Sequence, residues 1–78
     1  MIKLQILGSG CAKCTTLALN ADVAARSLAL EYELEKVTDI NAIIDAGVMS
    51  TPALAVDGEV KSVGRVLSVA EIKQLLTA

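Results

Sequence analysis

The only two cysteines of this 78-residue chain stand two residues apart, in Cys11-Ala12-Lys13-Cys14, directly after the turn Gly8-Ser9-Gly10. A short apolar run, Ile2 to Leu7, precedes the turn, and a long helical pattern follows it. Where a strand gives way to a helix, this spacing brings two sulfurs close enough to bond and leaves the first thiol at the positive end of the helix. We therefore expect a dithiol that cycles between its reduced and oxidised forms.

The length of the chain allows one small domain, which we place over residues 1–78, because a chain of this size holds a single hydrophobic core. Hydrophobic residues make up 54% of it, yet Tyr32 is the only aromatic residue, so the core must be packed from aliphatic side chains. The net charge is −2, with no cluster of Lys or Arg and no aromatic platform for stacking on bases. Nucleic acid is therefore not an expected partner.

Targeting and membrane signals are missing from the pattern of the chain. The opening run carries Lys3 and Gln5 and is too short for the apolar region of a signal peptide, and no stretch has the length of a membrane span. We therefore expect a cytoplasmic protein without a membrane partner. In that compartment a lone pair of cysteines is more often catalytic or metal-binding than a structural crosslink.

The first half of the chain alternates strand and helix patterns. Apolar residues at period two, Ile2, Leu4 and Ile6, predict a first strand that ends at Gly8, and residues at helical spacing predict an amphipathic helix from Ala12 to about Ala29. Strict alternation predicts a second strand over Glu31 to Glu35, with three carboxylates on one face. A short helix should follow, capped by Thr38 or Asp39 and ended by Gly47. We expect its three isoleucines to point one way; they are Ile40, Ile43 and Ile44.

The second half predicts a hairpin and a last helix. Two apolar runs, Ala53 to Val56 and Glu59 to Val63, flank Asp57-Gly58, a dipeptide favoured in two-residue hairpin turns. Ser68-Val69-Ala70-Glu71 matches a capping box and starts the final helix. The order β-α-β-α-β-β-α predicts an α/β fold, a four-stranded mixed sheet with helices on both faces.

The alternation also predicts which side chains are buried. The first and last helices should share one face of the sheet, and the short middle helix should cover the other. Five side chains should face the helix pair: Ile2, Leu4, Ile6, Tyr32 and Leu34. Five polar ones should line the less covered face: Lys3, Gln5, Glu31, Glu33 and Glu35.

Taken together, these elements resemble the thioredoxin fold in its minimal form, and they look most like the small redox-active disulfide proteins. The resemblance rests on Cys11 to Cys14, on Ser50-Thr51-Pro52 before the third strand and, more weakly, on Val63-Gly64-Arg65. It implies that Pro52 follows a cis peptide bond and lies against the cysteine pair. It also implies that the backbone of Thr51 pairs with an extended substrate, which makes Ser50, Thr51 and Pro52 the expected substrate-binding segment.

The same resemblance implies the activity and the partners. It implies an enzyme, a thiol-disulfide oxidoreductase or electron carrier, that needs no cofactor beyond its redox-active disulfide. Its partners would be protein disulfides and a reductase system of the thioredoxin or glutathione type. A monomer is expected, because no apolar stripe is left unassigned.

Two departures from the resembled families change the expected site. Thioredoxins carry a buried Asp six positions before the first cysteine, where it assists proton transfer from the second thiol, and this chain has Gln5 there. Glutaredoxins hold glutathione with a Gly-Gly-Asp type turn before the last helix, whereas this chain has Gly64-Arg65-Val66-Leu67-Ser68. Arg65 is then the candidate contact for a ligand carboxylate.

The chemistry of the first helical turn assigns the two thiols. Cys11 at or near the N-cap can accept backbone N–H hydrogen bonds as a thiolate and interacts with the helix dipole. Such settings lower the pKa of a thiol from about 8.5 to roughly 3.5–7.5. Lys13 either adds to this tuning or is simply a solvated helix residue. We expect Cys11 to attack a substrate disulfide and Cys14 to resolve the mixed disulfide.

A metal-binding or redox-sensing module using the same cysteine pair is the alternative. The spacing suits Cu(I) in small ferredoxin-like metallochaperones. A zinc site would need carboxylates or a second chain, because the chain has no His and no other Cys. The final capping box and Thr51-Pro52 argue against a metallochaperone, which ends on a strand, so no metal ligand set is assigned.

Overall fold

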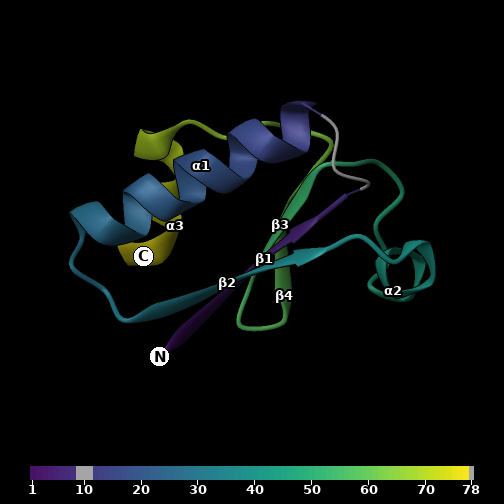
Figure 1. The fold of residues 1–78 in the computed structure, drawn as a ribbon, viewed down its shortest axis with the longest axis horizontal. Helices are drawn as coiled ribbons and strands as arrows, with labels where there is room; N and C mark the ends of the chain where they lie inside the picture. Colours follow the sequence, from purple (N-terminus) through teal and green to yellow (C-terminus); the bar gives the residue numbers. More distant parts are fainter. Residues whose placement is uncertain (9–11, 78) are drawn as a thin grey trace.

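A four-stranded sheet forms the fold, with two helices on one face and a short third helix near the ends of the strands, as Figure 1 shows for the computed structural model. The structure describes residues 1–8 and 12–77. The strands are β1 (Ile2–Leu7), β2 (Tyr32–Val37), β3 (Ala53–Val56) and β4 (Glu59–Val63). The helices are α1 (Ala12–Ser27), α2 (Ile40–Asp45) and α3 (Val69–Thr77). The predicted α/β class and element order are confirmed, with β2 ending two residues later than the alternation predicts.

The sheet has the strand order β2-β1-β3-β4. β1 pairs with β2 in parallel, and the other neighbours pair in antiparallel fashion, so the sheet is mixed. A parallel pair needs a crossover connection, which α1 supplies. The carboxyl ends of β1 and β2 therefore meet at one edge, where Leu7 pairs with Val37 and the N–H of Gly8 donates to the Val37 carbonyl at 3.0 Å.

The main core lies between the sheet and the helix pair α1 and α3, which pack on the same side of the strands (Figure 1). Its buried members are Leu4, Ile6, Leu17, Ala18, Ala21, Ala24, Ala25, Leu54, Leu67 and Ile72. Three partly buried side chains on its edge, Ile2, Tyr32 and Leu34, complete the face that the alternation predicts. Each fully buried Leu or Ile contributes about 1.5–3 kcal/mol.

A second, smaller cluster lies on the opposite face beneath α2. It consists of Leu7, Ile43, Val48, Ala53 and Ala55. The expectation that the isoleucines of α2 point one way is wrong, since Ile43 is 3% exposed whereas Ile40 and Ile44 are 63% and 62% exposed. A six-residue helix has fewer than two turns, so only one of its side chains reaches the sheet.

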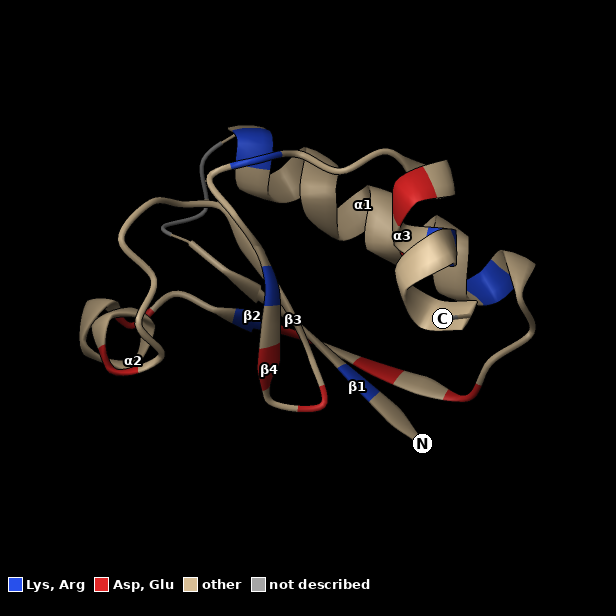
Figure 2. Cartoon of the chain, turned by 180° about the vertical axis from the view of Figure 1, so that it is seen from behind, with Lys and Arg blue, Asp and Glu red and all other residues tan. Residues whose placement is uncertain are grey.

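Polar residues occupy the rest of that face, as the alternation predicts. The Gln5 amide donates to Glu35 at 3.0 Å, and the Lys3 ammonium lies 3.7 Å from the same carboxylate. Figure 2 shows Lys and Arg interspersed with Asp and Glu over strands and helices. No helix in the described part of the chain is long and apolar enough to cross a membrane.

Short-range signals set the turns of the fold. Asp57 and Gly58 have φ values of 52° and 85°, and a two-residue turn of the I′ type needs positive φ at both positions. Asp39 caps α2 by accepting a hydrogen bond from the N–H of Asn41 at 3.1 Å. A further hydrogen bond joins α1 to the sheet, because the hydroxyl of Tyr32 in β2 donates to the Asp22 carboxylate in α1.

Candidate functional site

The carboxyl end of β1 and the first turn of α1 contain the predicted redox site. Cys11, with Ser9 and Gly10, lies outside the described residues, so its assigned role stays a prediction. α1 begins at Ala12, which places Cys14 in the first helical turn. The Cys14 side chain is buried, with 5% exposure. Lys13, its neighbour in that turn, is exposed.

Gly8 lies directly against the Cys14 thiol. A Cβ atom at residue 8 would overlap the Cys14 Sγ, whereas it would meet the Cβ atoms of Cys14 and Thr51 at ordinary contact distances of 3.5 and 3.6 Å. A side chain at this position is therefore excluded by the sulfur itself. Cys14 and Thr51, which are far apart in the sequence, therefore both lie close to the backbone of Gly8.

The predicted substrate-binding segment, Ser50, Thr51 and Pro52, lies next to this position. The peptide bond between Thr51 and Pro52 is cis, and Pro52 is fully buried, whereas Ser50 and Thr51 are exposed. The Pro52 carbonyl accepts a hydrogen bond from the N–H of Gly64 at 2.9 Å. A Cβ at Gly64 would stand 3.1 Å from the Ser50 Cβ, so the two backbones approach closely. The structure thus holds this segment between the end of β1 and the end of β4.

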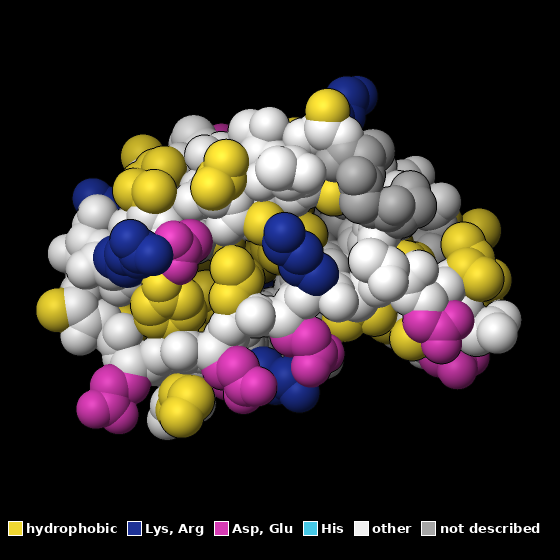
Figure 3. Space-filling view, in the orientation of Figure 1, with side chains coloured by type: hydrophobic (Ala, Val, Ile, Leu, Met, Phe, Trp, Pro, Cys, Tyr) yellow, Lys and Arg dark blue, Asp and Glu magenta, His cyan; other side chains and the backbone are white. Residues whose placement is uncertain are grey.

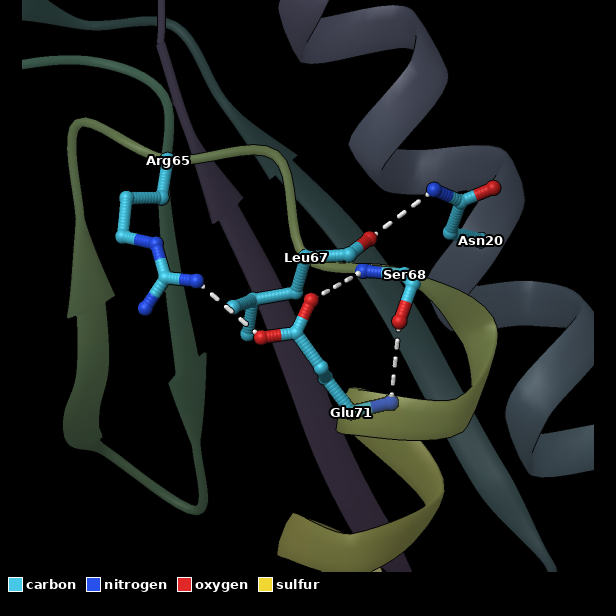
Figure 4. A network of polar contacts seen from close by, with 5 residues as sticks. All are labelled: Asn20, Arg65, Leu67, Ser68 and Glu71. Atoms are coloured by element: carbon cyan, nitrogen blue, oxygen red, sulfur yellow. Dashed lines mark hydrogen bonds and ion pairs between the residues drawn. The ribbon is translucent and has the colours of Figure 1, made fainter.

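Arg65 belongs to a polar network at the start of α3 (Figure 4). Its guanidinium lies 3.0 Å from Glu71, whose carboxylate also accepts the N–H of Ser68 at 3.1 Å. The N–H of Glu71 donates to the Ser68 hydroxyl at 3.2 Å, which completes the predicted capping box. Asn20 of α1 donates to the Leu67 carbonyl at 2.9 Å and ties the two helices together. In the structure Arg65 therefore forms an ion pair with the first turn of α3.

The same network perturbs one acidic group. The backbone N–H of Ser68, then its hydroxyl and then Arg65 hold the pKa of Glu71 below its ordinary value of 4.5. Each of these groups favours the charged carboxylate over the protonated acid. The Glu71 carboxylate in the capping box is therefore stabilised by the charge of Arg65 as well as by its hydrogen bonds with Ser68.

A cavity of about 140 Å³ opens beside the buried thiol. Its walls are Ile6, Gly8, Cys14, Thr15, Lys36 and Thr38. In Figure 3 the surface between α1 and the end of β2 is hollowed, and hydrophobic atoms show in its depth. Sequence reasoning missed Lys36 and Thr38 as site residues because it ended the second strand at Glu35. The signal was present, since the alternation that buries Tyr32 and Leu34 puts Lys36 on the same face of β2.

The described residues contain no group of three or more His, Cys, Asp or Glu side chains that could hold a metal ion. What the geometry offers is a buried thiol in a first helical turn, faced by a proline segment and a small cavity. A thiol in such a position can take part in exchange with a neighbouring sulfur.

Comparison with known proteins gives a consistent result over nearly the whole chain. The family model for the thioredoxin domain matches residues 2–77. A thioredoxin from Methanothermobacter thermautotrophicus is 47% identical over 77 residues, covering 99% of this chain and all of the relative. A thioredoxin from Methanocaldococcus jannaschii is 38% identical over 76 residues, covering 97% of this chain and 87% of the relative.

Proposed function

Because the chain belongs to the thioredoxin family and is a small thiol-disulfide oxidoreductase, we propose that Cys11 and Cys14 are the cysteines that exchange with substrate disulfides. The observation that carries the proposal is the position of Cys14. Its thiol is buried in the first turn of α1, against Gly8 and beside Thr51. These are the only two cysteines of the chain, and Cys11 stands three positions earlier in the sequence.

The proposed reaction proceeds in two exchange steps. The Cys11 thiolate attacks one sulfur of a substrate disulfide, forms a mixed disulfide and releases the first substrate thiolate. Cys14 then loses its proton and attacks the Cys11 sulfur, which forms the Cys11–Cys14 bond and releases the second substrate thiolate. The substrate gains two electrons and two protons, and the dithiol becomes a disulfide. No cofactor enters this scheme.

The remaining predicted residues have supporting roles in the proposal. Thr51 lies against the same position as Cys14, and Ser50 and Thr51 are exposed beside the buried Pro52, so we assign the segment Ser50, Thr51 and Pro52 to an extended substrate. Lys13 adds positive charge in the first turn of α1 and favours thiolate. Arg65 is 66% exposed and has further N–H donors beyond its pair with Glu71, so it stays the candidate contact for a substrate carboxylate.

The proposed setting is a cytoplasmic monomer that takes electrons from a reductase of the thioredoxin or glutathione type and delivers them to protein disulfides. The charge of the chain and its lack of a basic cluster support neither nucleic acid nor an anionic membrane surface as a partner. The comparisons favour thiol-disulfide exchange over the metal-binding alternative.

A redox titration tests the proposal directly. The protein is equilibrated in metal-free dithiol buffers of known potential, and its thiols are counted by the mass shift on alkylation. We expect one reversible two-thiol transition between about −270 and −120 mV. If the internal disulfide does not form and the protein binds Cu(I) or Zn(II) tightly, the result contradicts thiol-disulfide exchange and supports the metal-binding alternative.

Trapping separates the roles of the two thiols. A Cys14→Ser variant should accumulate mixed disulfides with a protein disulfide substrate, because the resolving attack is lost. The matched Cys11→Ser variant should accumulate none, since the attacking thiol is gone. Equal trapping by both variants would contradict the assignment.

A further inference from the structure

A groove of about 400 Å³ lies between the edge strand β4 and α3, away from the cysteines. Its walls include Lys61 and Ser62 of β4, Arg65 and Leu67 of the connection that follows, and Glu71 and Leu75 of α3. Binding sites for small molecules range from about 300 to 1,000 Å³, so the groove has room for one. It shares no wall residue with the cavity beside Cys14, so the two are separate sites.

A β-bulge in β4 turns two successive side chains toward this groove. Leu54 pairs with Ser62, whereas the next residue of β3 pairs with Val60. Lys61 is therefore an extra residue in β4. In a regular strand, successive side chains point to opposite faces of the sheet, and a bulge is a common means of redirecting one of them. Here Lys61 and Ser62 both line the groove, which gives it a cation and a hydroxyl at adjacent positions.

The Ser62 hydroxyl is a hydrogen-bonding group that the fold does not use. Its oxygen is buried, and it has no hydrogen-bond partner among the described residues. Buried polar groups in proteins are nearly always hydrogen-bonded, because leaving one unpaired is unfavourable. A ligand oxygen in the groove can provide the missing partner.

The charges of the wall suit a ligand with a single negative charge. Two cations, Lys61 and Arg65, lie against one carboxylate, Glu71, to which the guanidinium extends (Figure 4). The wall therefore has an excess of one positive charge. The Lys61 side chain, at 32% exposure, is the least exposed of the four cations that form ion pairs in the described residues. Its partner, Glu59, lies 3.2 Å away and is not part of the wall.

We propose that this groove binds a small organic monocarboxylate with a short apolar tail. The ligand carboxylate lies between the Lys61 ammonium and the Ser62 hydroxyl, and both donate hydrogen bonds to it. The tail packs on Leu67, which is buried, and on Leu75, which is half-buried. A phosphate ester suits the wall less well, because its second negative charge would meet the Glu71 carboxylate.

A chemical-shift titration of the full chain tests the site, with hexanoate as the probe and hexanamide, its uncharged analogue of equal length, as the comparison. At neutral pH hexanoate should shift the amide signals of Ser62, Arg65 and Leu75 in a saturable way, with a Kd on the order of 1–10 mM. Hexanamide should bind at least about threefold more weakly, and added salt should weaken hexanoate binding. Equal affinity for the two compounds, or shifts that do not saturate, would overturn the proposal.

Substitutions in the wall separate its two donors. Lys61→Met and Ser62→Ala should each weaken hexanoate binding about two- to fivefold, whereas Lys61→Arg should retain it. Lys73→Met removes a cation of α3 that is not part of the wall and should bind hexanoate as the wild type does. The proposal is overturned if Lys73→Met weakens binding as much as Lys61→Met, or if Ser62→Ala binds hexanoate as tightly as the wild type.

Stability measurements distinguish a ligand donor from a structural one. Ser62→Ala should not lower the melting temperature of the free protein, because the hydroxyl has no partner in the described residues. A lower melting temperature would show that the hydroxyl stabilises the fold, which contradicts its assignment to a ligand.

The site stands or fails independently of the proposed function, with which it shares only Arg65. Binding is measured without any disulfide substrate, so a negative titration leaves exchange at Cys11 and Cys14 intact. A failed redox titration likewise leaves the groove intact. If hexanoate shifts the amide signals of Cys14 and Thr15 more than that of Ser62, the probe occupies the cavity at the redox site, and the assignment to the groove is overturned.

Discussion

The sulfur of Cys14 occupies the space in which residue 8 would carry its side chain, so Gly8 and Cys14 form one packing unit at the end of β1. The other atoms near this position, the Cβ atoms of Cys14 and Thr51, lie at ordinary contact distances. The conflict with a larger residue therefore comes from the sulfur alone. Substitutions at Gly8 and Cys14, made singly and together, can therefore isolate the energy of this contact.

Gly8→Ala should destabilise the reduced protein by about 1–3 kcal/mol, because an added methyl group in a packed site forces its neighbours to move. In a Cys14→Ala background, the same substitution should cost much less, since the obstructing sulfur is absent. Urea unfolding of the four proteins under reducing conditions gives the coupling energy. An equal cost in both backgrounds would show that the sulfur is not the obstacle.

The capping box of α3 should make stability depend on pH in one direction. The folded pKa of Glu71 lies below its ordinary value, so the stabilisation is fully present above about pH 4.5 and is lost as pH falls through the folded pKa. Glu71→Gln should therefore be less stable than the wild type near neutral pH, and the difference should shrink in acid. Thermal unfolding at about pH 6 and about pH 3 measures it.

A matched substitution controls for general charge effects in that experiment. Glu33→Gln removes one carboxylate from an exposed position on β2, away from the box. Its stability difference from the wild type should change less between the two pH values than that of Glu71→Gln. A Glu71→Gln difference that stays constant, or grows in acid, would contradict the role assigned to the network in Figure 4.

The main core should tolerate little loss of volume. Leu54 is fully buried between the sheet and the helix pair, and Leu54→Ala should cost about 2–5 kcal/mol. Small domains are marginally stable, at about 5–15 kcal/mol, so this is a large share of the total. Leu19→Ala, at a position that is 60% exposed on α1, should change stability by less than about 0.5 kcal/mol. Similar losses from both substitutions in urea unfolding would argue against this core.

Sequence signals predicted best those features whose chemistry is local. The turn at Asp57-Gly58 and the capping box from Ser68 to Glu71 each depend on residues within four positions of one another, and both form. The two-residue period of β1 and β2 likewise predicted which side chains enter the main core. Isoleucines at helical spacing did not predict burial on α2, because the depth of a short helix on the sheet is a tertiary property.

The surroundings of Cys14 could be predicted only in part. Its place in the first turn of a helix follows from the strand-turn-helix pattern. Its contact with Gly8 depends on how α1 is seated on the sheet, and the cavity wall at Lys36 depends on the register of two strands about thirty residues apart. Such long-range placement needs the assembled sheet, since a shift of one residue would turn Lys36 to the other face.

Gly64 joins the end of β4 to the Thr51-Pro52 segment, and its substitution should disturb that segment. Gly64→Ala combines a left-handed φ of 71° with a Cβ that would stand 3.1 Å from the Cβ of Ser50. The backbone strain alone costs roughly 1–2 kcal/mol. The close contact adds to it and should push Ser50 and Thr51 away from the site, which should slow exchange with an extended protein disulfide.

The hairpin glycine provides the matched control for this prediction. Gly58 has a similar φ of 85°, but nothing lies within 4 Å of its would-be Cβ. Gly58→Ala should therefore lose stability through strain alone and keep the exchange rate of the wild type. Ser50→Gly removes the atom in conflict and should recover part of the loss in Gly64→Ala. If the two alanine variants lose the same stability and exchange at the same rate, the contact between Gly64 and Ser50 does not position the segment.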